Sequence, residues 1–205
     1  DPGLAAAWCR LQDLRSRGRE EDAWVQLQDD AARGDLPAGL LLSHWLLAEG
    51  DVEAVASTLD ALNPLAEEQA IYWRLRGTIA LQTGQEPLAR RLLQRAETLV
   101  GSSCATLSGL RGLASTLEEI LRWNLRLGEA GCGGAWPLLE NAALLADSGR
   151  PADALRTLVQ VLQTLQRLSA DELNAVEVMV QALSADAAEA WIKGAHRGTH
   201  GHARQ

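Results

Sequence analysis

The clearest structural pattern in the chain lies in Ile71–Leu99, IYWRLRGTIALQTGQEPLARRLLQRAETL. It predicts two short amphipathic helices joined by a tight turn at residues 83–85. Bulky and small residues alternate along it, as two helices require if their backbones are to approach closely; these residues are Trp73, Gly77, Gly84, Ala89, Leu93 and Ala96. Because one helical hairpin cannot bury its apolar face alone, the stretch predicts neighbouring hairpins of the same kind.

Glycines at similar intervals mark those neighbours. Gly18, Gly50 and Gly84 are separated by 32 and 34 residues. Each is followed five residues later by a small or β-branched residue and nine residues later by a leucine; the pairs are Ala23 and Leu27, Val55 and Leu59, and Ala89 and Leu93. After Gly149, Ala154 and Leu158 restore the same spacing. The chain therefore predicts a repeated helix–turn–helix unit.

This period and this small-then-large signature resemble the tetratricopeptide repeat (TPR) family. The match is densest in residues 71–99, where Trp73, Gly77, Gly84, Ala89 and Ala96 fall on positions that have the same residue types in the family consensus. The first two units are degenerate. The resemblance implies an all-α fold, an α-solenoid of antiparallel helical hairpins that forms a TPR-like superhelix.

We predict a single helical-repeat domain over residues 1–195, with eleven or twelve helices. The glycine-rich segment 101–134 departs from the repeat, and we interpret it as an irregular insertion with one helix over Leu113–Leu127. Ser169–Glu172 has the form of a capping box and predicts a helix through Leu183. Residues 185–193 predict a last short helix that caps the array, and residues 196–205 predict a flexible C-terminal tail.

Charge and hydropathy argue against two classes of partner. The formal net charge is −8, and the arginines are interspersed with acidic residues and form no basic run, which argues against nucleic-acid binding. No apolar run approaches the roughly 18 residues of a membrane span, and no signal segment opens the chain. The compartment stays open, with the cytoplasm favoured over the periplasm.

The sequence offers little chemistry for catalysis or metal binding. Cys9, Cys104 and Cys132 are widely spaced with no CxxC motif, which predicts neither a disulfide framework nor a zinc site. Three histidines cluster near the C-terminus at residues 196–202, but two glycines among them argue against a metal site. The acidic pairs at 29–30 and 118–119 are interpreted as solvated helix faces. We therefore predict no enzyme, no cofactor and no metal, with an unfamiliar helical active site as the remaining enzymatic alternative.

The resemblance implies that the first helix of each pair lines a concave groove. The predicted groove residues mix tryptophan, arginine and polar side chains, as protein interfaces do; they are Trp8, Gln12, Arg15, Leu40, His44, Arg74, Thr78, Gln82 and Trp136. We predict a scaffold or adaptor for protein–protein interaction that binds a peptide or helix of a partner protein there, within a bacterial multiprotein assembly. For the tryptophans, packing between helices is the alternative.

The alternative to a scaffold is a ligand-sensing regulatory domain of a larger protein, with a closed apolar pocket. Self-association is also possible, because terminal repeats expose an apolar face unless a helix caps them. Family members that clamp a partner's C-terminal carboxylate use lysine and asparagine in the groove, and the absence of groove lysines argues against that adaptor role.

Overall fold

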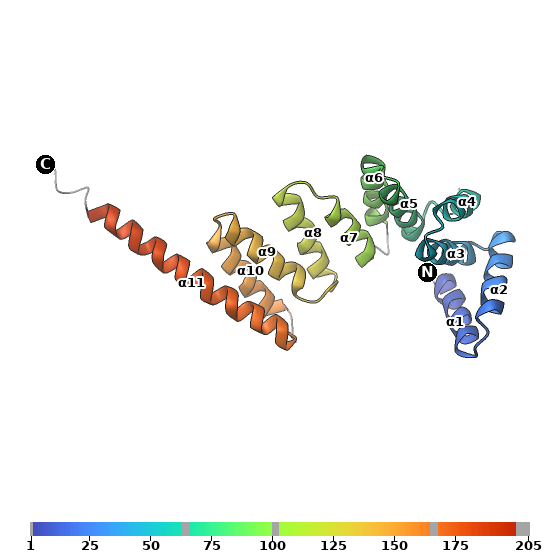
Figure 1. Cartoon of the computed structure of the whole chain (residues 1–205), viewed down its shortest axis with the longest axis horizontal. Helices are drawn as coiled ribbons and strands as arrows, with labels where there is room; N and C mark the ends of the chain where they lie inside the picture. The colour runs from blue at the N-terminus through green and yellow to red at the C-terminus, as the bar shows by residue number, and fades with distance from the viewer. Residues whose placement is uncertain (1, 63–65, 100–102, 165–167, 200–205) are drawn as a thin grey trace. The chain divides into compact units, whose positions relative to one another are not determined.

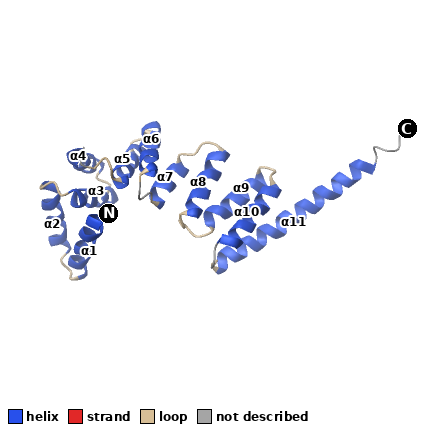
Figure 2. Ribbon diagram, turned by 180° about the vertical axis from the view of Figure 1, so that it is seen from behind, coloured by secondary structure: helices blue, strands red, loops and turns tan. Residues whose placement is uncertain are grey.

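The computed structural model describes the backbone of residues 2–62, 66–99, 103–164 and 168–199, and the side chains of 3–62, 66–99, 103–163 and 168–185. All regular structure in these ranges is α-helical, in eleven helices joined by short connections (Figure 1, Figure 2). The chain divides into two compact units, unit 1 over residues 1–113 and unit 2 over residues 114–205. The predicted all-α class is confirmed.

Unit 1 contains seven helices, each of which packs against its neighbours in the sequence. They are α1 (Pro2–Ser16), α2 (Glu20–Ala32), α3 (Leu36–Glu49), α4 (Val52–Leu62), α5 (Ala70–Gln82), α6 (Glu86–Thr98) and α7 (Cys104–Gly112). Contacts also join α1 to α3, α3 to α5 and α5 to α7. These four, the odd-numbered helices of unit 1, therefore form a continuous row.

Unit 2 contains four helices: α8 (Leu117–Glu129), α9 (Trp136–Asp147), α10 (Pro151–Thr164) and α11 (Ala170–Thr199). Successive helices pack together, and α9 also contacts α11. Its core combines residues of α9, α10 and α11, among them Leu139, Leu158 and Val176.

The predicted turn glycines end their helices in the left-handed backbone conformation. Their φ angles are +71° at Gly18, +83° at Gly50, +72° at Gly84 and +76° at Gly149. After each glycine, the next residue donates its backbone N–H to the carbonyl five residues earlier; at Gly84 this bond measures 2.7 Å. This is the Schellman arrangement, in which a left-handed residue lets the chain satisfy carbonyls left open at a helix end. The four turns are therefore confirmed.

The small-then-large signature marks the residues that hold each hairpin together. The residues five and nine positions after these four glycines are at most 5% exposed; they are Ala23, Leu27, Val55, Leu59, Ala89, Leu93, Ala154 and Leu158. The smaller residue lets two helices approach, and the leucine removes apolar surface from water. The repeated spacing in the sequence thus corresponds to a repeated pattern of burial.

Glycines set the closest helix contacts within unit 1. A Cβ atom at Gly77 of α5 would lie 2.7 Å from Cγ of Leu93 on α6, and one at Gly109 of α7 would lie 2.9 Å from Cδ1 of the same leucine. Leu93 therefore occupies space that the absence of two side chains leaves open. Gly39 makes a similar space for Leu62 between α3 and α4.

Three predicted boundaries differ from the structure. Residues 103–134 contain two helices, α7 and α8, where the sequence predicted one. The predicted helix over Leu113–Leu127 corresponds to α8, which begins at Leu117 because Thr116 caps it, whereas α7, which Ser103 caps, was not predicted. The last two predicted helices are one continuous helix, α11, which also takes in 196–199 of the predicted tail. Serine at 184 does not break the helix, since only glycine and proline disfavour a helix interior strongly.

Candidate functional site

A pocket of about 350 Å³ opens on the row of odd-numbered helices in unit 1. Its lining comes from α1, α3, α5 and the N-terminal end of α7; the residues are Leu4, His44, Ala70, Ile71, Arg74, Ser103, Ala105 and Thr106. Two predicted groove residues, His44 and Arg74, thus lie in one cavity. We call this cavity the Arg74 pocket.

Helix capping places the two ends of this pocket. Asp35 begins α3 by accepting a hydrogen bond from the backbone N–H of Ala38 at 2.8 Å, which puts His44 two turns further along the helix. Ser103 begins α7 in the same way, with its Oγ 3.3 Å from the backbone nitrogen of Thr106. The N-terminal end of α7, which carries the positive end of the helix dipole, therefore faces the pocket.

Among the described residues that line the pocket, Arg74 is the one arginine or lysine. Burial lowers the pKa of its guanidinium, but the group stays charged because an arginine side chain does not lose its proton in proteins. No ion pair or side-chain hydrogen bond of Arg74 with another described residue is present. A partly buried cation without a carboxylate beside it favours the entry of an anion.

His44 adds no positive charge at neutral pH. Although part of its side chain reaches solvent, its surroundings lower the pKa of the imidazole, first because they shield it from water and second because the Arg74 charge repels a proton. His44 therefore offers a neutral ring, which can donate one hydrogen bond and accept another.

Two further predicted groove residues continue the face of α1 that carries Leu4. Trp8 and Gln12 follow Leu4 at intervals of four residues, so the three share one side of the helix. The Trp8 side chain is 45% exposed. An apolar surface thus lies one helical turn from the Arg74 pocket.

Thr78 and Gln82 follow Arg74 on α5 at the same spacing, so they lie on one side of that helix. Thr78 donates its hydroxyl hydrogen to the backbone carbonyl of Arg74 at 3.0 Å, and Gln82 is exposed. These residues extend the predicted surface along α5.

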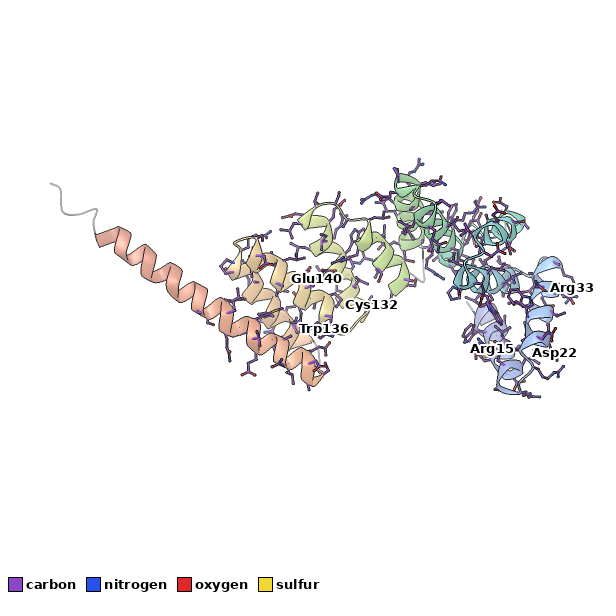
Figure 3. All side chains as sticks on the ribbon, in the orientation of Figure 1. Arg15, Asp22, Arg33, Cys132, Trp136 and Glu140 are labelled. Carbon is purple, nitrogen blue, oxygen red and sulfur yellow. The ribbon has the colours of Figure 1, made fainter. Side chains whose placement is uncertain are left out.

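The other three predicted groove residues lie elsewhere. Leu40 is 1% exposed and belongs to the core, so its prediction as a surface contact is wrong. Arg15 lies near the end of α1 (Figure 3), and it pairs with Glu20 at 2.9 Å. Trp136 begins α9 in unit 2 (Figure 3), and it is 52% exposed.

Six residues of the pocket lining were not predicted as site residues, namely Leu4, Ala70, Ile71, Ser103, Ala105 and Thr106. Three of them, Ser103, Ala105 and Thr106, lie in the segment predicted as an irregular insertion. The sequence did contain a signal for Ser103 and Thr106. Serine is a common N-cap residue, because its side-chain oxygen accepts a hydrogen bond from the backbone N–H three residues later.

The cysteines correct one further interpretation. Cys104 and Cys132 are each disulfide-bonded, whereas Cys9 is a free and exposed thiol. Among the described residues, no group of three or more His, Cys, Asp or Glu side chains is placed to hold a metal ion. The side chains of the histidine cluster at residues 196–202 lie outside the described residues. None of the described helices has both the length and the apolar character of a membrane span.

No protein-family model matches the sequence, and a comparison with curated proteins finds no match. The likeness to tetratricopeptide repeats therefore rests on the residues of the chain itself.

Proposed function

We propose that the chain is a TPR-like protein-interaction module whose Arg74 pocket binds a carboxylate side chain of a partner protein. The observation that carries this proposal is the guanidinium of Arg74, which lies partly buried in a pocket of about 350 Å³ with no acidic partner among the described residues. A bound carboxylate would gain a charge-assisted hydrogen bond and would offset the cost of burying that charge.

The surroundings of Arg74 support a peptide as the source of the carboxylate. Trp8 offers an exposed aromatic surface one turn from the pocket residue Leu4, and tryptophan and arginine dominate the energetics of many protein interfaces. The contacts between α1, α3, α5 and α7, together with the four equivalent glycine turns, support the solenoid arrangement of the family. A peptide would then lie along this row, with its acidic side chain in the pocket.

The test compares two labelled pentapeptide amides, Ala-Leu-Glu-Leu-Ala and its glutamine analogue, by fluorescence anisotropy. We expect the glutamate peptide to bind wild-type protein at least about tenfold more tightly, and Arg74→Gln to remove this preference. Arg91→Gln is the matched control, because Arg91 is an exposed arginine on α6 outside the pocket. A preference that persists in Arg74→Gln, or that is absent from the wild type, would overturn the proposal.

A capture experiment tests the same proposal with natural partners. Arg74→Ala and Trp8→Ala variants would be used as bait beside wild-type protein. If every partner that the wild type retains is still retained by both variants, the predicted groove is not the binding surface.

The ligand-sensing alternative is favoured by one observation, the pocket volume. About 350 Å³ falls in the range of cavities that hold small molecules. In that case a small dicarboxylate such as succinate would raise the melting temperature of the wild type but not of Arg74→Gln. A shift of this kind without any peptide preference would favour sensing over scaffolding.

A further inference from the structure

A second cavity of unit 1 has the opposite electrostatic character. It is open, has a volume of about 450 Å³, and is lined by Glu20, Glu21, Trp24, Trp45 and Glu49. Trp24 of α2 and Trp45 of α3 meet edge to face, with ring centroids 4.9 Å apart and planes inclined by 70°. The cavity therefore combines an aromatic corner with three carboxylates, and we call it the tryptophan corner.

The chain already holds one guanidinium against this corner. The central carbon of the Arg15 guanidinium lies 5.2 Å from the centroid of a Trp45 ring, and Arg15 also pairs with Glu20 at 2.9 Å. The face of an aromatic ring attracts a cation, and tryptophan does so most strongly. Arg15 thus demonstrates within the chain the contacts that a guanidinium makes here.

One arginine does not balance the charge of the corner. Glu21 and Glu49 have no ion pair with another described residue. Glu20 and Glu21 lie in the first turn of α2, where the helix dipole favours carboxylates. Glu49 is the last residue of α3, where the dipole disfavours a negative charge. Its position is therefore not explained by helix stability.

We propose that the tryptophan corner binds the guanidinium of an arginine side chain from a partner protein. A guanidinium is planar and weakly hydrated, so it stacks on tryptophan while its N–H groups donate to carboxylates. In this arrangement the partner's arginine lies against the tryptophan pair and donates to Glu49 and Glu21. This site goes beyond the proposed function and does not depend on it, since it shares no lining residue with the Arg74 pocket.

The test uses N-acetyl-arginine amide as the probe and N-acetyl-citrulline amide as its neutral isostere. The probes are titrated into ¹⁵N-labelled protein while the indole N–H signals of the tryptophans are observed by NMR. We expect the arginine probe to shift the Trp24 and Trp45 signals and leave those of Trp8 and Trp136 unchanged, with no comparable shift from citrulline. Equal shifts from both probes would overturn the proposal.

A pair of matched variants locates the site. Glu49→Gln should weaken binding of the arginine probe at least about threefold, whereas Glu53→Gln should leave it unchanged, because Glu53 is exposed on α4 outside the corner. Both substitutions remove one negative charge from an exposed position. An equal loss of affinity for the arginine probe in the two variants would mean that the probe is attracted to the acidic surface in general. N-acetyl-lysine amide that binds as tightly as the arginine probe would contradict the preference for a guanidinium.

Discussion

Leu93 is a single side chain around which α5, α6 and α7 come together. The glycines that face it leave no room for a methyl group, with distances of 2.7 Å and 2.9 Å from the position of a Cβ atom to the leucine. We expect Gly77→Ala to lower the free energy of unfolding by about 1–3 kcal/mol, the usual cost of overpacking. Chemical denaturation checks this value.

Gly112→Ala is the matched control for that substitution. Gly112 lies at the end of α7, and a Cβ atom there would have no heavy atom within 4 Å. Alanine also favours a helix more than glycine does, so this variant should be neutral or slightly stabilising. If the two variants have the same stability, Leu93 is not held as tightly as the distances indicate.

Glu172 links the start of α11 to the start of α9. Its carboxylate accepts hydrogen bonds from the backbone N–H of Ala135 at 2.7 Å and from the backbone N–H and hydroxyl of Ser169, both at 2.8 Å. These three hydrogen bonds hold the pKa of Glu172 below its ordinary value. The bond from the Ser169 backbone has the largest effect, followed by the bond from the Ala135 backbone and then by the bond from the Ser169 hydroxyl. The side chain thus closes the predicted capping box and also binds a second helix end.

Glu172→Gln should lower the free energy of unfolding by about 1–3 kcal/mol at neutral pH, because hydrogen bonds to a charged acceptor are lost from a residue that is only 7% exposed. Glu177→Gln, an exposed position on the same helix, should have little effect. Since the pKa of Glu172 is lower in the folded state, its stabilisation is present above the unfolded pKa and is lost as the pH falls through the folded pKa. The stability difference between wild type and Glu172→Gln should therefore narrow in acid.

The pKa of His44 reports on the charge of Arg74. Shielding from water and the Arg74 cation both lower it, so Arg74→Gln should raise the pKa of His44 toward its ordinary value. An NMR titration of the His44 ring protons measures the change. Binding of an anion in the Arg74 pocket should shift the pKa in the same direction, whereas an unchanged pKa in Arg74→Gln would mean that the two groups do not interact.

At the scale of the element, each hairpin depends on the left-handed glycine in its turn. Gly84 has φ of +72°, and its missing Cβ atom would meet nothing within 4 Å. Gly84→Ala should therefore cost about 1–2 kcal/mol through backbone strain alone, and Gly84→Asn should cost less, because asparagine tolerates this conformation. Thermal denaturation measures the stabilities of the two variants, and equal stabilities would contradict the explanation by backbone strain.

Element boundaries were predictable where their signals were local. The Schellman turns use hydrogen bonds that reach back five residues, and the capping box at Ser169 spans four residues, so the sequence alone indicates them. The sequence did not predict α7 and predicted the start of α8 at Leu113 instead of Leu117, because the glycine-rich segment 101–134 indicates irregular structure. Gly109 instead marks a close helix contact with Leu93, which no local pattern reveals.

In the molecule as a whole, each of the two units contains a hydrophobic core. Val55 and Leu75 lie in a core of unit 1, and Leu139 and Val161 in that of unit 2. In helical repeats, stability is close to a sum of local and nearest-neighbour terms. We therefore expect Glu172→Gln to raise hydrogen exchange in α9 and α11 and leave α3–α6 unchanged. Mass spectrometry of peptic fragments measures this, and a uniform rise across the chain would show a single cooperative block.

Some residues of the candidate sites were predictable from local sequence patterns, and others come together only through helix packing. His44 and Arg74 were predicted from helical spacing and a family resemblance, and they do line one pocket. Leu40 was assigned to the same face, but the packing of α3 against α4 and α5 buries it. The tryptophan corner was not predicted, because Trp24 and Trp45 are 21 residues apart and meet only when α2 packs on α3.

Sequence patterns were sufficient to predict the all-α class, the glycine turns and the buried pairs in each hairpin, because interactions over a few residues specify them. Which polar groups meet depends instead on how the helices pack. Glu172 reaches Ala135 across 37 residues, and the Arg74 pocket draws its lining from α1, α3, α5 and the start of α7. The physical reason is that a charge's environment depends on the groups within a few ångströms of it, and helix packing places those groups.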